Sequence, residues 1–374
     1  MKTGVLMVIL AVALLLTGYV GWHLWRIAPG VWKWVALGIF VLWALTFFVG
    51  FFTMEHMPIP VATVVYEVGN TWLIAFLYLL LLFAVADIAA LCHLLPKVYL
   101  KDSAAGLLTA VGIVAVILTI GSFHYQHKYR EEMTLVTDKP LEKPLTVVMA
   151  SDLHLGYHNR KAELARWVDL INAEHPDLVL LGGDIVDRSL RPVLEGNYAE
   201  EFRRIEAPVY TVLGNHEYFG DIAQTEQFFK EADIVLLKDS VAYVKGLTIV
   251  GRNDRTYLRR LSLQQLQEKS PIHNLSPATN SFSQFSILLD HQPYHLEEAE
   301  AAGFDFQFSG HTHQGQVWPL SWIVDAMYEK AWGHYQRGNT HYYVSSGLGI
   351  WGAKIRIGTR SEYLVLHIVS NCEF

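Results

Sequence analysis

The stretch LTVVMASDLH, residues 145–154, combines a β-type run with chemically active side chains. Its first part, Leu145–Ala150, is apolar and β-branched, which is typical of a buried strand. Its second part places a carboxylate, Asp152, and an imidazole, His154, just after that strand. In open α/β sheets the strand ends form the ligand crevice. The stretch therefore predicts an α/β fold in which the functional groups follow the strands.

The same pattern occurs at four later positions. Asp, Asn or His side chains also follow the β-type runs Leu178–Leu181, Val209–Leu213, Phe285–Leu289 and Phe306–Ser309. The remaining periodicity predicts helices at Lys161–Ala173, Tyr198–Ile205 and Gln224–Ala232, and strands at Ala242–Val244, Leu247–Val250, Tyr342–Ser345 and Tyr363–Ile368. Strands that alternate with helices, followed by closely spaced strands, indicate a layered α/β domain with some antiparallel pairing.

Seven side chains from these strand ends form a candidate metal site. They are Asp152, His154, Asp184, Asn215, His291, His311 and His313. Imidazole, carboxylate and amide groups without a thiolate suit divalent Mn, Fe or Zn. Seven ligands are too many for one tetrahedral zinc and suit two ions about 3.5–4 Å apart, which Asp184 can bridge. In an extended Asp-x-His or His-x-His segment, the first and third side chains face the same way, so both are expected to point into the crevice.

Each motif has an ordinary structural explanation when it is taken alone. Asp-x-His and His-x-His are common, Gly214-Asn215 is also an ordinary turn, and a single histidine such as His291 is more often a core or surface residue. Five such clusters, in order and each after an apolar β-type run, have no comparable explanation. The joint pattern therefore favours a catalytic metal site.

The motifs together resemble those of the calcineurin-like metallophosphoesterases. The resemblance covers roughly residues 144–370 and rests on Asp152-x-His154, Gly183-Asp184-x-x-Asp187, Gly214-Asn215-His216-Glu217, His291 and Gly310-His311-x-His313. The segments Ser346–Gly349 and Arg356–Glu362 further resemble the branch that contains membrane-anchored bacterial members and transmembrane proteins with a metallophosphoesterase domain. Gln314 departs from the glycine usual in that branch, but it follows the ligands and removes none of them.

The resemblance implies a four-layer α/β/β/α sandwich and a role for each matching residue. One divalent ion would be held by Asp152, His154, Asp184 and His313, and the other by Asp184, Asn215, His291 and His311. His216 would face the phosphate and either stabilise its charge or protonate the leaving oxygen. Asp187 and Glu217 would support the ligands. The choice among Mn, Fe, Zn and Mg stays open.

The expected reaction is hydrolysis of a phosphoester or pyrophosphate bond by attack of a metal-bridging hydroxide. Two dications lower the pKa of the bridging water and neutralise phosphate oxygens. A protonated His216 would offset charge on the leaving group, and such general acid catalysis contributes about 10²–10⁴ in rate. Arg252 and Asn253 follow the predicted strand Leu247–Val250 and are candidates to line the substrate side.

The first third of the chain has a different composition. Hydrophobic residues make up 52% of the 374 residues and charged residues only 17%, and the charges are concentrated after residue 125. Four apolar stretches, Gly4–Trp25, Val31–Phe52, Thr71–Leu95 and Ala104–Phe123, each reach the length of about 20 residues that crosses the hydrocarbon. We therefore expect a four-helix transmembrane domain over residues 1–125, a linker over 126–143 and a catalytic domain over 144–374.

Asp87 lies inside the third apolar stretch, where an ionisable group marks either a functional site or a carboxylate paired inside the helix bundle. The two cysteines, Cys92 and Cys372, make no disulfide framework. Four spans place the segments before and after them on one face of the membrane. Basic residues near the spans number four on one side and three on the other: Arg26, Lys33, Lys97 and Lys101 against Lys2, Lys128 and Arg130. This count favours a catalytic domain outside the cytoplasm.

A further aromatic segment, Trp318–Trp332, follows the last predicted ligands. It is expected either to lie near the bilayer or the substrate entrance, or to form a small hydrophobic cap packed on the domain. Its tryptophans are Trp318, Trp322 and Trp332.

The leading hypothesis is a membrane-anchored dimetal phosphoesterase that acts on a phospholipid, a lipid-linked pyrophosphate or a soluble phosphoester. Members of the family that the chain resembles include hydrolases of UDP-2,3-diacylglucosamine in lipid A biosynthesis, so that molecule is the first named candidate. One alternative is a catalytically silent sensor or scaffold, which the intact ligand set argues against. Another is a transporter with a regulatory domain, supported only by Asp87. The net charge of −7 indicates no nucleic-acid partner, and no obligate protein partner is expected.

Overall fold

Four long apolar helices make up most of the first of two units, which contains Met1–His124 and Gly352–Ile355. They are α1 (Thr3–Ile27), α2 (Trp32–Thr53), α3 (Ile59–Leu91) and α4 (Ala104–Gln126). Each is long and apolar enough to cross a membrane, because a helix rises 1.5 Å per residue through a hydrocarbon core of about 30 Å. The four predicted helices are confirmed. The structure is a computed structural model that describes residues 3–269 and 282–371, so Lys2 and Cys372 lie outside the described residues.

The third helix begins earlier than predicted. The sequence predicted a span from Thr71, whereas α3 starts at Ile59 and runs for 33 residues. Pro60 lies in its first turn, where proline is tolerated because that N–H has no intrahelical partner. Near the other end of α3, the Asp87 carboxylate accepts a hydrogen bond from the Tyr19 hydroxyl at 2.7 Å and lies 3.1 Å from His23 Nε2. Asp87 therefore joins α3 to α1, as in the structural alternative for this residue.

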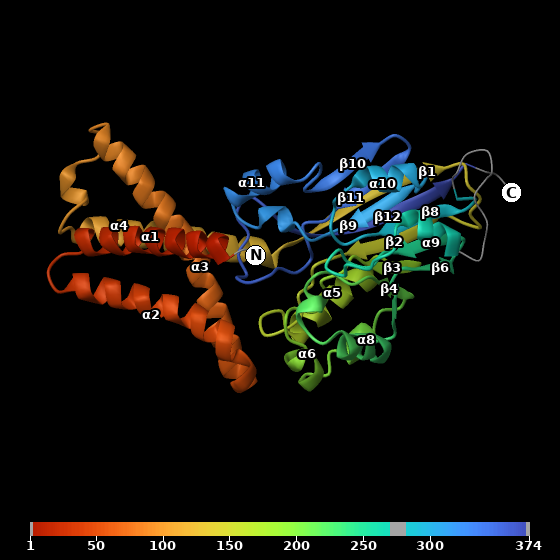
Figure 1. Cartoon of the computed structure of the whole chain (residues 1–374), viewed down its shortest axis with the longest axis horizontal. Helices are drawn as coiled ribbons and strands as arrows, with labels where there is room; N and C mark the ends of the chain where they lie inside the picture. The colour runs from red at the N-terminus through yellow and green to blue at the C-terminus, as the bar shows by residue number, and fades with distance from the viewer. Residues whose placement is uncertain (1–2, 270–281, 372–374) are drawn as a thin grey trace. The chain divides into compact units, whose positions relative to one another are not determined.

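Two six-stranded sheets form the core of the second unit, Tyr125–Trp351 with Arg356–Phe374 (Figure 1). The first sheet has the order β1-β12-β2-β3-β4-β5, and the second has the order β10-β11-β9-β8-β7-β6. The strands of the first sheet are β1 (Lys128–Thr137), β12 (Ser361–Ser370), β2 (Leu145–Ala150), β3 (Leu178–Leu181), β4 (Val209–Thr211) and β5 (Ile234–Leu236). The strands of the second are β10 (Gly333–Arg337), β11 (Thr340–Val344), β9 (Phe306–Ser309), β8 (Phe285–Leu289), β7 (Leu247–Gly251) and β6 (Ser240–Val244).

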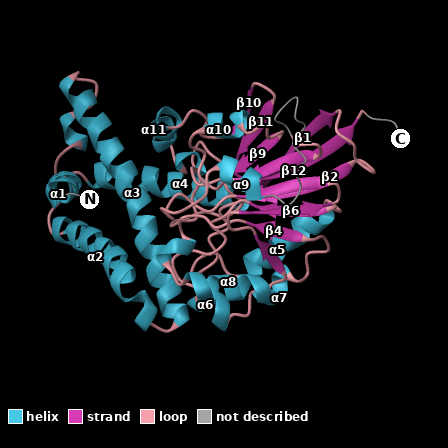
Figure 2. Cartoon of the chain, turned by 45° about the vertical axis from the view of Figure 1, so that its right-hand side comes forward, coloured by secondary structure: helices cyan, strands magenta, loops and turns pink. Residues whose placement is uncertain are grey.

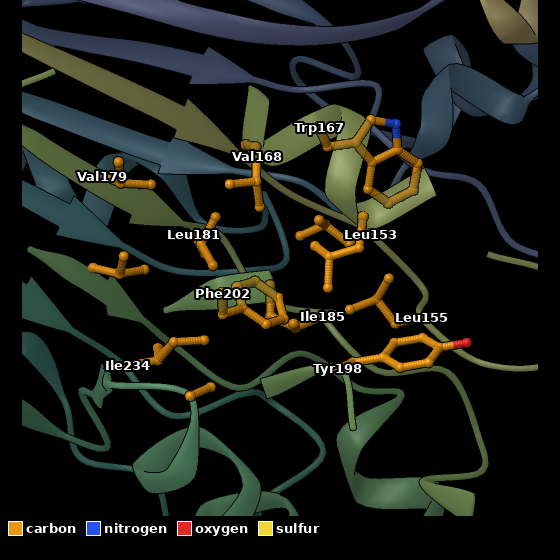
Figure 3. Packing of buried hydrophobic residues seen from close by; sticks show 14 of the residues in the cluster. Leu153, Leu155, Trp167, Val168, Val179, Leu181, Ile185, Tyr198, Phe202 and Ile234 are labelled. Carbon is orange, nitrogen blue, oxygen red and sulfur yellow. The ribbon is translucent and has the colours of Figure 1, made fainter. Parts of the chain in front are cut away.

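Helices cover the outer face of each sheet and complete four α/β/β/α layers. On the first sheet these helices are α5 (Lys161–Ala173), α6 (Arg191–Glu195), α7 (Ala199–Phe202) and α8 (Ile222–Glu231). Figure 3 shows Val168 of α5 near Leu181 of β3 in this layer, and Trp167 of the same helix near Leu153. On the second sheet, α9 (Leu263–Lys269) and α10 (Leu296–Ala301) pack against β7, β8 and β11.

The side chains of β2 explain why a strand in this position is apolar throughout. Val148 and Ala150 pack among the helices, whereas Val147 and Met149 pack between the two sheets. Successive side chains of a strand point to opposite faces, and both faces of this strand are buried. The same double burial holds for β3, which is apolar throughout, and for β8 and β9, whose few polar side chains are also buried.

Strand β1 corrects the predicted linker. The segment 126–143 was expected to be a tether, but Lys128–Thr137 forms an edge strand paired in parallel with β12. Its side chains Met133 and Leu135 pack between the sheets, but the charged residues of its first half, Lys128 and Arg130–Glu132, hid the strand pattern. Strands β5 and β10 were not predicted, and the helix expected at Tyr198–Ile205 is reduced to α7.

Candidate metal centre

The seven predicted ligands come from loops that follow five strands of the two sheets. The loops after β2, β3 and β4 carry ligands from the first sheet, and those after β8 and β9 carry ligands from the second. Figure 2 shows the loops of the second unit crowded at one end of its strands. Parallel strands deliver their following loops to the same edge, so residues far apart in sequence meet there.

The ligands form clusters that converge on Asp184. One group consists of Asp152, His154 and His313, and another of Asp184, His291 and His311, with the ligand atoms of each group within 4.8 Å of one another. Oδ2 of Asp184 lies 3.1 Å from His291 Nε2 and 3.7 Å from His154 Nε2. The carboxylate is therefore placed between the two groups, within reach of both.

Asn215 Oδ1 is buried at this site, and residues 3–269 and 282–371 provide it with no hydrogen bond. His291 Nε2 is also buried, and it faces the Asp184 carboxylate at 3.1 Å. Leaving a buried polar group unsatisfied costs about 1–3 kcal/mol. In addition, His154 Nε2 and His313 Nε2 face one another at 3.0 Å. Nitrogen and oxygen donors directed at a common point fit divalent cations, so the residues present suit the metal ions expected from the sequence.

The backbone of the ligand loops differs from the expected extended form. Asp152, His154, Asp184, His311 and His313 all have positive φ, between 45° and 71°. These residues adopt left-handed conformations in sharp loops, so the argument from extended Asp-x-His and His-x-His segments was wrong. Such a conformation costs a non-glycine residue roughly 1–2 kcal/mol, and the surrounding structure must enforce it.

Glu217 is one of the groups that enforce this conformation. Its carboxylate accepts hydrogen bonds from the backbone N–H groups of Ile185 at 2.6 Å, Gly214 at 2.7 Å and Val186 at 3.0 Å. Glu217 thereby connects the loop that carries Asp184 to the loop that carries Asn215. The predicted supporting role of Glu217 agrees with this geometry.

Two glycines allow the loops to approach each other. A Cβ atom on Gly214 would lie 2.1 Å from Asp184 Oδ1, and one on Gly310 would lie 2.2 Å from Asp152 Oδ2. Both distances are far inside van der Waals contact. Any side chain at either position would push a candidate ligand out of place.

His216 lies beside the ligand clusters. Its backbone N–H donates to Asp184 Oδ1 at 2.8 Å, and its Nδ1 lies 2.8 Å from Asp187 Oδ1. Burial by itself would lower the pKa of His216. The hydrogen bond to Asp187 and the negative charges of Asp184 and Asp187 outweigh this effect and raise the pKa to about 9. The Asp187 contact fixes one ring nitrogen and favours the protonated imidazolium.

Arg252 and Asn253 have structural contacts rather than a free face toward a substrate. The Arg252 guanidinium binds Glu298 at 2.6 Å and Asp290 at 3.3 Å, so its charge is neutralised inside the protein. Asn253 Oδ1 accepts a hydrogen bond from the Tyr218 hydroxyl. Asn253 thereby holds Tyr218, which lies on the same loop as His216.

Arg356 is a positioning residue that sequence reasoning missed. It is fully buried, and its guanidinium donates to the backbone oxygens of His313 at 2.7 Å and Ser346 at 2.5 Å. Burial lowers its pKa to about 10. An arginine in a polar loop is normally exposed, so only its place in the quoted segment Arg356–Glu362 singled it out.

Comparison with known proteins places this site in context. A family model described as calcineurin-like phosphoesterase matches residues 145–315. An uncharacterized metallophosphoesterase of Campylobacter jejuni is 30% identical over 262 residues, which cover 68% of each chain. A Helicobacter pylori counterpart is 30% identical over 241 residues, covering 64% of this chain and 63% of that protein. A Danio rerio transmembrane protein with a metallophosphoesterase domain is 28% identical over 58% of this chain and 52% of its own length.

Proposed function

The chain belongs to the calcineurin-like metallophosphoesterase family and is a phosphoester hydrolase, and we propose that it uses two divalent ions and acts on a lipid-linked substrate. The observation that carries the two-ion proposal is the Asp184 carboxylate, which lies within 3.7 Å of imidazole nitrogens from both ligand groups. We assign Asp152, His154, Asp184 and His313 to one ion, and Asp184, Asn215, His291 and His311 to the other.

Divalent ions at such ligands, when bound, supply a water acidic enough to attack near neutral pH and positive charge for the phosphate oxygens. The protein's own side chains position the substrate and supply the proton for its leaving group. His216, held by Asp187 through Nδ1, keeps Nε2 for the substrate and donates a proton to the departing oxygen. Glu217 keeps the two ligand loops at a fixed spacing, which limits the reorganisation needed in the transition state.

Metal removal distinguishes a metal-dependent hydrolase from a catalytically silent scaffold. The purified full-length protein should hydrolyse p-nitrophenyl phosphate when it is supplied with Mn, Fe, Zn or Mg. A chelator should abolish the activity, and one of these ions should restore it. Hydrolysis that persists at the same rate in the chelator would contradict a metal-dependent reaction.

The proposal of a lipid-linked substrate rests on α11 (Leu320–Met327). Three of its apolar side chains are largely exposed: Trp322 at 66%, Ile323 at 57% and Met327 at 63%. The helix follows the turn that carries His313, and the residue after it is Tyr328, whose ring centroid is 6.4 Å from that of His311. A packed cap would bury these side chains, so we propose that they contact the acyl region of the substrate.

Trp332 differs from the other tryptophans of this segment. Its indole N–H donates to both carboxylate oxygens of the buried Glu362, at 2.9 and 3.0 Å. It therefore has a structural role. The exposed α11 side chains and a phosphoester cleavage site fit an amphiphilic molecule, and UDP-2,3-diacylglucosamine is the first candidate because it joins acyl chains to a pyrophosphate.

Substitutions on α11 test this proposal. The double variant Trp322→Ser and Ile323→Ser should raise KM for an acylated phosphoester by about 100-fold or more, since each apolar side chain buried against an acyl chain contributes about 1.5–3 kcal/mol. The same variant should hydrolyse a soluble ester as the unchanged protein does. Trp332→Ser is the comparison, because its loss should lower the thermal midpoint and affect both substrates. Equal losses on both substrates in the α11 variant would favour a structural role for this helix.

A further inference from the structure

Within the described residues, one nitrogen of the Arg255 guanidinium has no hydrogen-bond partner, and two tyrosines connect this arginine to the candidate metal centre. Nη1 of Arg255 is buried, and it makes no hydrogen bond to any residue in the described ranges 3–269 and 282–371. Its neighbours on the same loop differ in this respect, because Arg252 and Arg260 both pair with Asp290. A buried cationic donor without a partner is costly unless a ligand completes its hydrogen bonds.

Two tyrosines connect Arg255 to the metal-site histidines. The Arg255 guanidinium carbon lies 4.4 Å from the centroid of the Tyr294 ring. The Tyr294 hydroxyl donates to the Tyr328 hydroxyl at 2.9 Å, and the Tyr328 ring is 6.4 Å from that of His311. Arg255 is thus held on an aromatic surface that leads to a candidate ligand.

The loop that carries Arg255 is also fixed to the loop that carries His291. The carboxylate of Asp254, which is fully buried, accepts hydrogen bonds from Gln292 Nε2 at 3.0 and 2.9 Å. Asp254 and Gln292 directly adjoin Arg255 and His291 in sequence. Arg255 is therefore held in a defined position relative to the metal centre.

Stacking on Tyr294 occupies one face of the guanidinium and leaves its edge for hydrogen bonds. A planar guanidinium edge matches the oxygens of a phosphoryl group, often through two parallel hydrogen bonds. The phosphoryl group that is hydrolysed is engaged at the metal centre. We propose that Arg255 binds a second phosphoryl group of the same substrate, so that the preferred substrates carry at least two. This inference rests on the proposed function and specifies its substrate class.

Equilibrium binding of two nucleotides tests the inference without turnover. The full-length protein, purified in detergent and loaded with Mn, is titrated with adenosine diphosphate and adenosine monophosphate in a calorimeter. The two probes share the same base and sugar, so the ratio of their affinities reports the second phosphoryl group. We expect a ratio of tenfold or more for the unchanged protein and a ratio near one for Arg255→Met. Arg255→Lys, which keeps the charge but loses the planar edge, should give an intermediate ratio.

Two further variants separate binding from folding. Arg259→Met replaces an exposed arginine of the same loop and should keep the unchanged ratio. Tyr294→Leu keeps Arg255 but removes the ring beneath it, and it should lower the ratio. A ratio that survives Arg255→Met, or a parallel loss of affinity for both nucleotides, would overturn the inference. A protein that binds the nucleotides with the expected ratio but hydrolyses no phosphoester would instead contradict the proposed function alone.

Discussion

The Asp184 carboxylate determines how many ions the candidate site can hold. Burial by itself would raise the pKa of this group. The neighbouring His291 has the larger effect, so the pKa lies well below the usual value for aspartate. The group is therefore ionised and keeps both oxygens available as ligands. The backbone of Asp184 has a positive φ, and this conformation places its side chain between the ligand groups.

Replacing Asp184 by asparagine should nearly abolish hydrolysis. The amide has one ligating oxygen and no charge, so it weakens the link to both ions at once. We expect a loss of at least about 100-fold, since changes to groups that merely orient metal ligands already cost 10–100-fold. Elemental analysis should find two ions in the unchanged protein and fewer in Asp184→Asn. The exposed Asp169→Asn is the control. One ion or none in active protein would refute the two-ion proposal.

His216→Ala should lower turnover more than metal content, because His216 is assigned to the leaving group and not to an ion. The loss should be about 100-fold for an alkyl phosphate, within the range of general acid catalysis. It should be smallest for nitrophenyl phosphate, whose leaving group needs no proton. Asp187→Asn should show the same dependence on the leaving group in a weaker form. Equal losses on both esters would contradict the assignment of His216 as the acid.

At the scale of elements, sequence patterns located the strands whose two faces are both buried. The bounds of β2, β3, β8 and β9 agree with the predicted runs, because burial of both faces favours mostly apolar segments. Strand β1 escaped prediction since it is an edge strand whose first half is largely charged, with Met133 and Leu135 only in its second half. The short strands β5 and β10 have too few residues to show a period.

The candidate site was predictable in composition but not in geometry. Strand ends indicated which side chains converge, since the topology of a parallel sheet delivers them to one edge. The left-handed backbone of Asp152 or His311 carries only a weak sequence signal: Asp and His adopt positive φ more often than most non-glycine residues, but the surrounding structure decides where they do so. The roles of Arg255 and Arg356 depend on contacts between segments distant in sequence, such as that of Arg356 with His313.

The observed β1 strand changes the expected boundary of a stable catalytic fragment. A fragment starting at residue 144 removes β1 and uncovers β12, which pairs with it over ten residues. It also loses the packing of Met133 and Leu135, so its thermal midpoint should be about 10 °C below that of a fragment starting at Tyr125. An unpaired edge of β12 should also promote aggregation.

Calorimetry and light scattering of the two fragments check this prediction. A third fragment starting at His127 is the control, because it keeps β1 and removes only the end of α4. Equal midpoints for the fragments that begin at Tyr125 and residue 144 would show that β1 contributes little to stability.

At the scale of the whole molecule, the connection between the helices and the catalytic unit is short. Only His127 separates α4 from β1, so the catalytic unit begins directly after the last apolar helix. Four membrane-crossing helices would return the chain to the face on which it started, so the segments before α1 and after α4 would share that face. The orientation of the spans therefore decides which compartment supplies the substrate.

The distribution of basic residues gives a prediction for that orientation. Arg26, Lys33, Lys97 and Lys101 lie at the α1–α2 and α3–α4 connections, against Lys2, Lys128 and Arg130 at the other ends of the helices. This count of four against three leans towards a catalytic unit outside the cytoplasm, but counting Lys139 makes the two sides level and counting Lys143 reverses them, so the positive-inside rule needs a clearer bias than this. A reporter that is active only outside the cytoplasm, fused after residue 374, should be active. A well-expressed but silent fusion would contradict this orientation.

The outcome also bears on the substrate, because nucleotide-linked lipid precursors such as UDP-2,3-diacylglucosamine are cytoplasmic molecules. An active reporter would therefore exclude that candidate and leave lipids and phosphoesters of the outer compartment, among which the Arg255 inference favours those with two phosphoryl groups.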